Sequence, residues 1–111
     1  MTALTLLLFR SINSAVLEKG NIKAVEVILP KTSHVYTEVF ISNLKASVTL
    51  KKFQNYNMRM IVTDFRKNTI CDVNIKNGYS SCVWTPSWTG HFNVEIVNES
   101  DKLNKYEINI N

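Results

Sequence analysis

The sequence contains few of the residues that mark specialised classes of protein. Its 111 residues include only three glycines, two prolines, two cysteines and two histidines. So little glycine and proline excludes collagen-like and low-complexity chains, and no apolar run reaches the roughly 18 residues of a membrane-spanning helix. No glycine-rich phosphate loop, nucleophile elbow or cluster of metal ligands is visible. The sequence therefore predicts a protein with no cofactor, no metal site and no catalytic residues.

What is present is the composition of one packed domain. Hydrophobic residues make up 45% of the chain and charged residues 20%, and a chain of this length forms a single core. The charge is uneven, because residues 1–67 carry ten basic and four acidic side chains whereas residues 68–111 carry three and five. The basic pairs Lys51-Lys52 and Arg66-Lys67 are interpreted as solvated surface, with an anion-binding patch as the alternative.

Apolar residues recur at every second position in several segments, which is the pattern of half-buried strands. Near the C-terminus the pattern predicts that residues 91–96 and 105–110 form an antiparallel pair. The residues expected to be largely buried there are Phe92, Val94, Ile96, Tyr106 and Ile108. Further strands are expected within residues 25–29, 35–41, 46–50 and 58–65. Seven or eight short strands joined by turns predict an all-β sandwich or barrel.

The first 17 residues are ambiguous. Residues 3–9 are apolar, like the centre of a signal peptide, but no basic residue precedes them and Arg10 ends the run early. An export-signal remnant, a first strand and a short helix all fit this segment. Residues 18–111 are predicted to be the single β-sandwich domain.

Two cysteines, Cys71 and Cys82, flank a predicted hairpin turn at residues 76–78. A four-residue loop over residues 75–78 would place the two cysteines directly opposite each other, within bridging distance, whereas a two-residue turn would make them diagonal neighbours. We expect a disulfide, with two buried free thiols as the alternative.

The segment that follows Cys82 carries a more specific pattern. Residues 82–98 read CVWTPSWTGHFNVEIVN, and residues 104–108 read NKYEI. This resembles the C-terminal signature of the bacterial pre-peptidase C-terminal domain family, in which a "TP…TG" corner precedes an aromatic-alternating strand, an Asn and a closing "N-x-Y-x-L" strand. A looser similarity extends upstream to about residue 20.

The resemblance implies a jelly-roll-like antiparallel β-sandwich that is usually appended to secreted bacterial proteases and other exported enzymes. Such domains have no catalytic residues and are associated with substrate adhesion or secretion. Two departures stand out: the family's acidic "D-x-D-L" segment is replaced by the asparagine-rich residues 55–58, which removes the carboxylates that calcium prefers, and the closing Gly of "D-x-x-G" is Asn68, a residue that tolerates positive φ.

The corner also supplies the candidate binding residues. Pro86 ends one strand and Gly90 offers a conformation closed to other residues. Trp84 is expected to point inward, and Trp88 is either a plug for the corner or part of a stacking surface. Loop residues with aromatic, amide or imidazole groups are the candidate ligand contacts, and if adjacent they would suit a polysaccharide or an extended protein: Trp88, Tyr79, Tyr56, Asn57 and His91. His34 and His91, the only histidines, are both expected to face solvent.

Two classes of function follow. The favoured one is a non-catalytic accessory module of an exported bacterial protein, secreted or periplasmic, that binds carbohydrate or protein and works with a parent or partner protease. The alternative is an intracellular or phage-type protein that docks an acidic partner or nucleic acid through its basic first half. The family resemblance and the cysteine pair favour the first class and make nucleic acid the less favoured partner.

Overall fold

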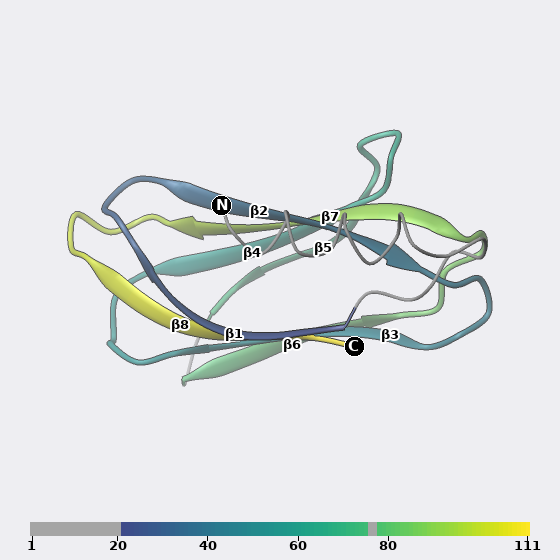
Figure 1. Cartoon of the computed structure of the whole chain (residues 1–111). Coiled ribbons are helices and arrows are strands. Elements are labelled where there is room, and N and C mark those ends of the chain that lie inside the picture. The colour runs from purple at the N-terminus through teal and green to yellow at the C-terminus, as the bar shows by residue number, and fades with distance from the viewer. Residues whose placement is uncertain (1–20, 76–77) are drawn as a thin grey trace, which may run out of the picture.

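A computed structural model describes residues 21–75 and 78–111, and every regular element in that part of the chain is a strand (Figure 1). The strands are β1 (Ile22–Ile28), β2 (Ser33–Phe40), β3 (Ala46–Lys52), β4 (Met58–Thr63), β5 (Thr69–Asn74), β6 (Tyr79–Trp84), β7 (Gly90–Asn98) and β8 (Asn104–Ile110). Eight short strands joined by brief connections confirm the predicted all-β class.

The strands form two four-stranded antiparallel sheets that pack face to face (Figure 1). One sheet has the order β1-β8-β3-β6 and the other the order β2-β7-β4-β5. Among the described strands, only β4 and β5 are consecutive in sequence and neighbours in the same sheet; every other connection crosses between the layers. This confirms a β-sandwich, and it places the loops at the two ends of the molecule.

The predicted pairing of residues 91–96 with residues 105–110 is wrong. β7 pairs with β2 and β4, whereas β8 lies in the other sheet between β1 and β3. The error has a physical origin: two strands whose inner faces meet across a core show the same alternation as two strands that pair within a sheet. Alternation therefore identifies the buried face but not the partner strand.

The alternation does identify the core correctly. Phe92 is 1% exposed, and Val94, Ile96, Tyr106 and Ile108 are each 0% exposed. They pack in one apolar cluster with inward-facing residues from all the remaining strands. Trp84 packs against this cluster, with its ring centre 4.9 Å from that of Phe40.

Three polar side chains connect the two sheets inside the core. The Tyr106 hydroxyl of β8 lies 2.8 Å from the Tyr36 hydroxyl and 2.6 Å from Nδ1 of His34, both on β2. The expectation that His34 faces solvent is wrong, because its ring turns inward to this bond. Burial lowers the pKa of His34, an effect partly opposed by Glu26, and raises the pKa of both tyrosines. The imidazole is therefore neutral at pH 7.

The Asn that follows the aromatic strand has a structural role. Asn98 is 0% exposed, and its Nδ2 donates to the carbonyl oxygens of Ile28, Leu29 and Lys102 at 2.8–3.2 Å. These bonds join the end of β1 to the crossing between β7 and β8. A buried amide is suited to this task because it satisfies several backbone acceptors at once.

The cysteines do not lie on a hairpin. β5 pairs with β4 and β6 pairs with β3, so Cys71 and Cys82 belong to different sheets. Cys82 lies in the core and Cys71 packs against it where the two edge strands approach each other, and burial together with the neighbouring Cys71 raises the pKa of Cys82. The structure holds both as free thiols. The strands on either side of the predicted hairpin turn therefore lie in different sheets, and residues 76–77 of that turn lie outside the described residues.

Candidate binding site

The structure separates the five candidate residues into two groups. Trp88 and His91 lie where β7 begins, and Tyr56 and Asn57 lie near the other end of that strand, since the Asn57 carbonyl accepts from the Glu99 N–H. Because β7 runs from residue 90 to residue 98, the two ends are about 25 Å apart. Tyr79 begins β6 and belongs to the second group, opposite Lys51. The five residues therefore do not form one surface.

The Trp88 indole, at the end of the sandwich where β7 begins, packs against two other aromatic rings. The indole stacks on Phe92, with ring centres 5.7 Å apart and planes at 14°. The Phe65 ring lies perpendicular to the indole, with centres again 5.7 Å apart and planes at 89°. Trp88 Nε1 is buried and has no hydrogen-bond acceptor among the described residues. One face of the ring thus covers the core while the outer part remains at the surface.

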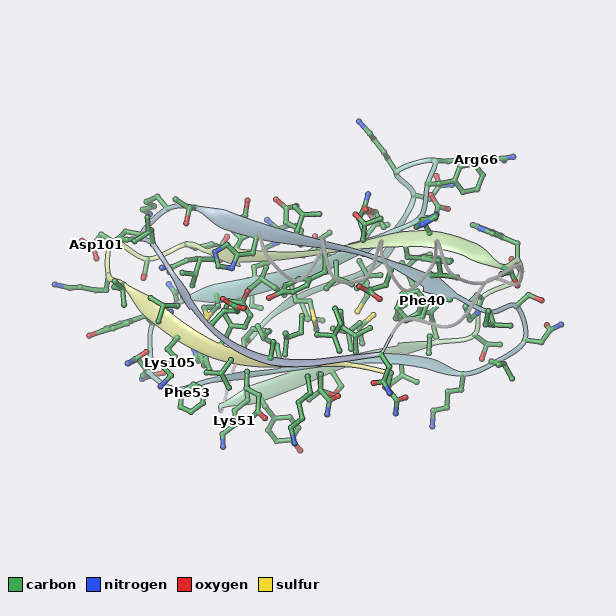
Figure 2. The ribbon with its side chains drawn as sticks, viewed as in Figure 1. Phe40, Lys51, Phe53, Arg66, Asp101 and Lys105 are labelled. Carbon is green, nitrogen blue, oxygen red and sulfur yellow. The ribbon has the colours of Figure 1, made fainter. Side chains whose placement is uncertain are left out.

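A groove lies beside this indole. We call it the Trp88 groove. It has a volume of about 560 Å³ and is lined by Phe65, Arg66, Trp88, Thr89, Gly90 and His91. The first two residues come from the turn between β4 and β5, which projects from the sandwich in Figure 1 and carries Arg66 at its tip in Figure 2. The Phe65 ring is 60% exposed, and the Arg66 guanidinium lies 5.2 Å from its centre.

The sequence did not single out Phe65 and Arg66 as contacts. Phe65 falls at the end of a predicted strand, and Arg66 falls in a basic pair that the sequence assigns to solvated surface, with an anion-binding patch as the alternative. The signal that could have identified them is a large apolar residue directly before the basic pair of a predicted turn, because a turn cannot bury such a side chain in its own sheet. His91 does lie in the groove and is exposed, as the sequence predicted.

Asp64 builds the turn that carries this part of the groove. Its carboxylate accepts hydrogen bonds from the Arg66 and Asn68 backbone N–H groups, both at 2.8 Å, and from the Asn68 side chain at 3.0 Å. Lys67 has a φ of 66°, so the left-handed residue of the turn is Lys67 and not Asn68. Asn68 contributes as a hydrogen-bonding partner. The "D-x-x-N" sequence is thus a turn closed by its first and last side chains.

The hydrogen bonds at Asp64 predict a pH-dependent stability. Desolvation alone would raise the pKa of this carboxyl, but the bonds from Asn68 and Arg66 outweigh it and lower the pKa. A lowered folded-state pKa gives a contribution that is present above about pH 4 and is lost as the pH falls through the folded-state value. We expect Asp64→Asn to lower the Tm at pH 6 and the difference from wild type to shrink at pH 3.

Asp101→Asn, an exposed change in the loop between β7 and β8, is the control and should not alter the Tm at pH 6. A Tm difference between wild type and Asp64→Asn that is the same at both pH values would contradict this assignment.

Gly90 does not have the left-handed conformation that the corner was expected to need, since Gly78 is the one described glycine with positive φ. Instead, the indole of Trp88 lies over its α-carbon. A β-carbon at this position would be 3.4 Å from Trp88 Cδ1 and 3.6 Å from Nε1. These are ordinary van der Waals separations, so a small side chain would fit beside the indole at this position.

The described residues offer little for catalysis. His34 is bonded to Tyr106, and within residues 21–75 and 78–111 neither histidine hydrogen-bonds to a serine, cysteine or carboxylate. In the same ranges no three His, Cys, Asp or Glu side chains converge as metal ligands. The described part of the chain also contains no helix of the length and apolarity that crossing a bilayer requires. The Trp88 groove, with two large rings, a guanidinium and an imidazole, has the composition of a binding surface.

Comparisons with known proteins identify the fold. No family profile matches the chain, and no curated protein matches its sequence. Among solved structures it is similar to the pre-peptidase C-terminal domain of a collagenase from Bacillus anthracis, with a TM-score of 0.71 over 82% of this chain and 89% of that chain, at 11% identity. The chain therefore has the β-sandwich fold of a pre-peptidase C-terminal domain, as its corner sequence predicted.

Proposed function

We propose that this chain is a non-catalytic accessory module of an exported bacterial protein, and that the Trp88 groove binds an extended polypeptide. The Trp88 groove is the observation that carries the proposal. The similarity to a domain of a collagenase supports an association with a parent or partner protease. It also makes collagen the first polymer to test.

The chemistry of the groove favours a polypeptide over a neutral polysaccharide. A sugar ring packs best on an open aromatic face, but one face of Trp88 covers Phe92 and the perpendicular Phe65 ring occupies a further part of the indole. What remains accessible is the Phe65 ring, the Arg66 guanidinium and the His91 imidazole. An extended peptide offers apolar side chains for the ring and carbonyl or carboxylate oxygens for the two nitrogen donors.

A disulfide between Cys71 and Cys82 belongs to the same proposal. In an oxidising compartment two thiols in contact across a domain are readily joined, and here the bond would connect the two sheets at their β5 and β6 edges. Burial, together with the neighbouring Cys71, raises the pKa of the Cys82 thiol. Cys82 is therefore protonated at neutral pH, so exchange with an external disulfide has to begin at the half-buried Cys71.

The experiment is retention of the folded protein on insoluble collagen. Wild type and the variants Phe65→Ala and Arg66→Ala are compared, because both side chains are exposed on a turn and neither supports the core. We expect each variant to bind about tenfold more weakly, since central aromatic and arginine contacts dominate interfaces of this kind. Leu44→Ala is the matched control: Leu44 is also apolar and 52% exposed, but it does not line the groove.

Equal loss of retention in Leu44→Ala would contradict a specific groove. Unchanged retention in both folded groove variants would remove the proposed site. Cellulose run in parallel distinguishes the ligand class, because binding to cellulose but not to collagen would assign the groove to a polysaccharide. Circular dichroism of each variant separates loss of binding from loss of fold.

A further inference from the structure

A second surface lies at the opposite end of the sandwich from the Trp88 groove. Figure 2 shows Lys51, Phe53 and Lys105 together, far from Arg66. The ammonium groups of Lys51 and Lys105 lie 5.6 and 5.1 Å from the centre of the Phe53 ring. Tyr79 stands directly opposite Lys51 in the pairing of β3 with β6. We call these four residues the Phe53 patch.

Both aromatic rings of the patch are exposed to solvent. Phe53 is 47% exposed and Tyr79 is 64% exposed, the highest value among the large apolar side chains that the structure describes. An exposed ring flanked by two cations gains some cation–π energy, but its outer surface stays in water. Such a cluster is unusual on a surface that binds nothing.

Neither lysine of the patch forms a close ion pair with another described residue. Within residues 21–75 and 78–111, neither Lys51 nor Lys105 has a carboxylate within 4.0 Å, whereas Arg59 pairs with Asp72 and Glu99. Glu107 is the acidic residue nearest in register, opposite Lys51 on β8. The patch therefore keeps an excess of positive charge.

Backbone contacts fix the elements that carry the patch. The Phe53 N–H donates to the Lys105 carbonyl at 3.0 Å, and the Lys105 N–H donates to Oε1 of Gln54 at 3.2 Å. On the other side, the Lys52 N–H donates to the Gly78 carbonyl at 2.8 Å, next to Tyr79. Since three separate segments are joined here, the backbone that carries the cations and rings is held in place before a ligand arrives, which lowers the entropic cost of binding.

We propose that the Phe53 patch binds an anionic polysaccharide. Sulfate or carboxylate groups would meet the two lysines, and the apolar faces of the intervening sugar rings would pack on Tyr79 and the free part of Phe53. A nucleic acid fits less well, because its charges lie on the backbone phosphates, apart from the bases that would stack on the rings, whereas the patch sets its two cations 5.6 and 5.1 Å from the centre of the Phe53 ring. A sulfated or carboxylated sugar carries its charge on the same ring that packs against the aromatic side chain.

The test uses heparin as the probe and titration calorimetry at low ionic strength, with the whole chain. The variant Lys51→Ala/Lys105→Ala is compared with the control Lys23→Ala/Lys67→Ala, which removes the same charge from exposed positions outside the patch. We expect the patch variant to bind about tenfold more weakly with a weaker dependence on salt. The control should change by no more than about threefold. Tyr79→Ser should weaken binding and leave the salt dependence unchanged.

Several results would overturn the proposal. The first is failure of the wild-type protein to bind heparin. The second is equal weakening of heparin binding in the patch variant and the control, because the attraction would then reflect net charge alone. Tighter binding of a single-stranded oligothymidylate than of heparin would assign the surface to nucleic acid instead. Arg66→Ala should weaken heparin binding no more than the control does, so this test and the collagen test have independent outcomes.

Discussion

Phe92→Ala should destabilise the protein by about 3–5 kcal/mol, the usual cost of deleting a buried phenyl ring. Phe92 is 1% exposed, and its ring contacts Phe40, Trp84 and Trp88 at centre separations of 5.5–5.7 Å. A domain of this size is stable by about 5–15 kcal/mol, so the variant should be largely unfolded in mild urea. Urea unfolding followed by circular dichroism measures the change.

Val97→Ala is the control for Phe92→Ala. Val97 lies on the same strand with its side chain on the outer face and half-buried, so the loss should be less than about 1 kcal/mol. If the two variants lose equal stability, or if Phe92→Ala melts within a few degrees of wild type, the assignment of the aromatic cluster as the centre of the core is wrong.

Oxidation of Cys71 and Cys82 should stabilise the protein by about 2–3 kcal/mol, because the bond would close a loop of a dozen residues in the unfolded chain. With oxidised glutathione as the oxidant, the Cys71 thiolate attacks the external disulfide and releases one glutathione thiolate. Cys82 then displaces the second glutathione, and the two cysteine thiols have lost two protons and two electrons in all. Intact mass under non-reducing conditions detects the loss of two hydrogen atoms.

The control for the disulfide is Cys71→Ala/Cys82→Ala, whose stability should not respond to reductant. The oxidised wild type should lose its extra stability when reductant is added. Two outcomes count against the bond: thiols that remain free after prolonged exposure to oxidised glutathione, or an oxidised form no more stable than the reduced one. Either would leave the cysteines as two buried thiols of the core.

The sequence allowed the class of fold and the buried faces to be predicted, because both depend on local alternation. Phe92 and Tyr106 were placed in the core correctly, for each sits among polar neighbours with a period of two. The corner at residues 84–90 also carried enough of a family pattern to indicate the right sandwich. Each of these features depends only on residues that are close together in the sequence.

Features that depend on which strands become neighbours were not predicted. β7 and β8 were expected to pair, and the cysteines were expected on a hairpin, because a short turn-like segment looks the same whether it reverses within a sheet or crosses to the other layer. The same limit applies to the candidate site. His91 and Tyr79 both lie in loops or at strand ends, but only the topology shows that they occupy opposite ends. Phe65 lies beside Trp88 because the turn after β4 folds toward the corner before β7, and no local sequence pattern predicts that approach.

The most direct test of the central claim is an amide nitrogen–proton NMR titration of the wild-type protein with a soluble collagen peptide. The account predicts chemical-shift changes concentrated at residues 65–66 and 88–91, with residues 51–57 and 104–107 unaffected. Chemical-shift changes confined to the opposite end of the sandwich would contradict the assignment of the Trp88 groove as the binding site. The absence of any change would contradict it as well, if insoluble collagen retains the protein.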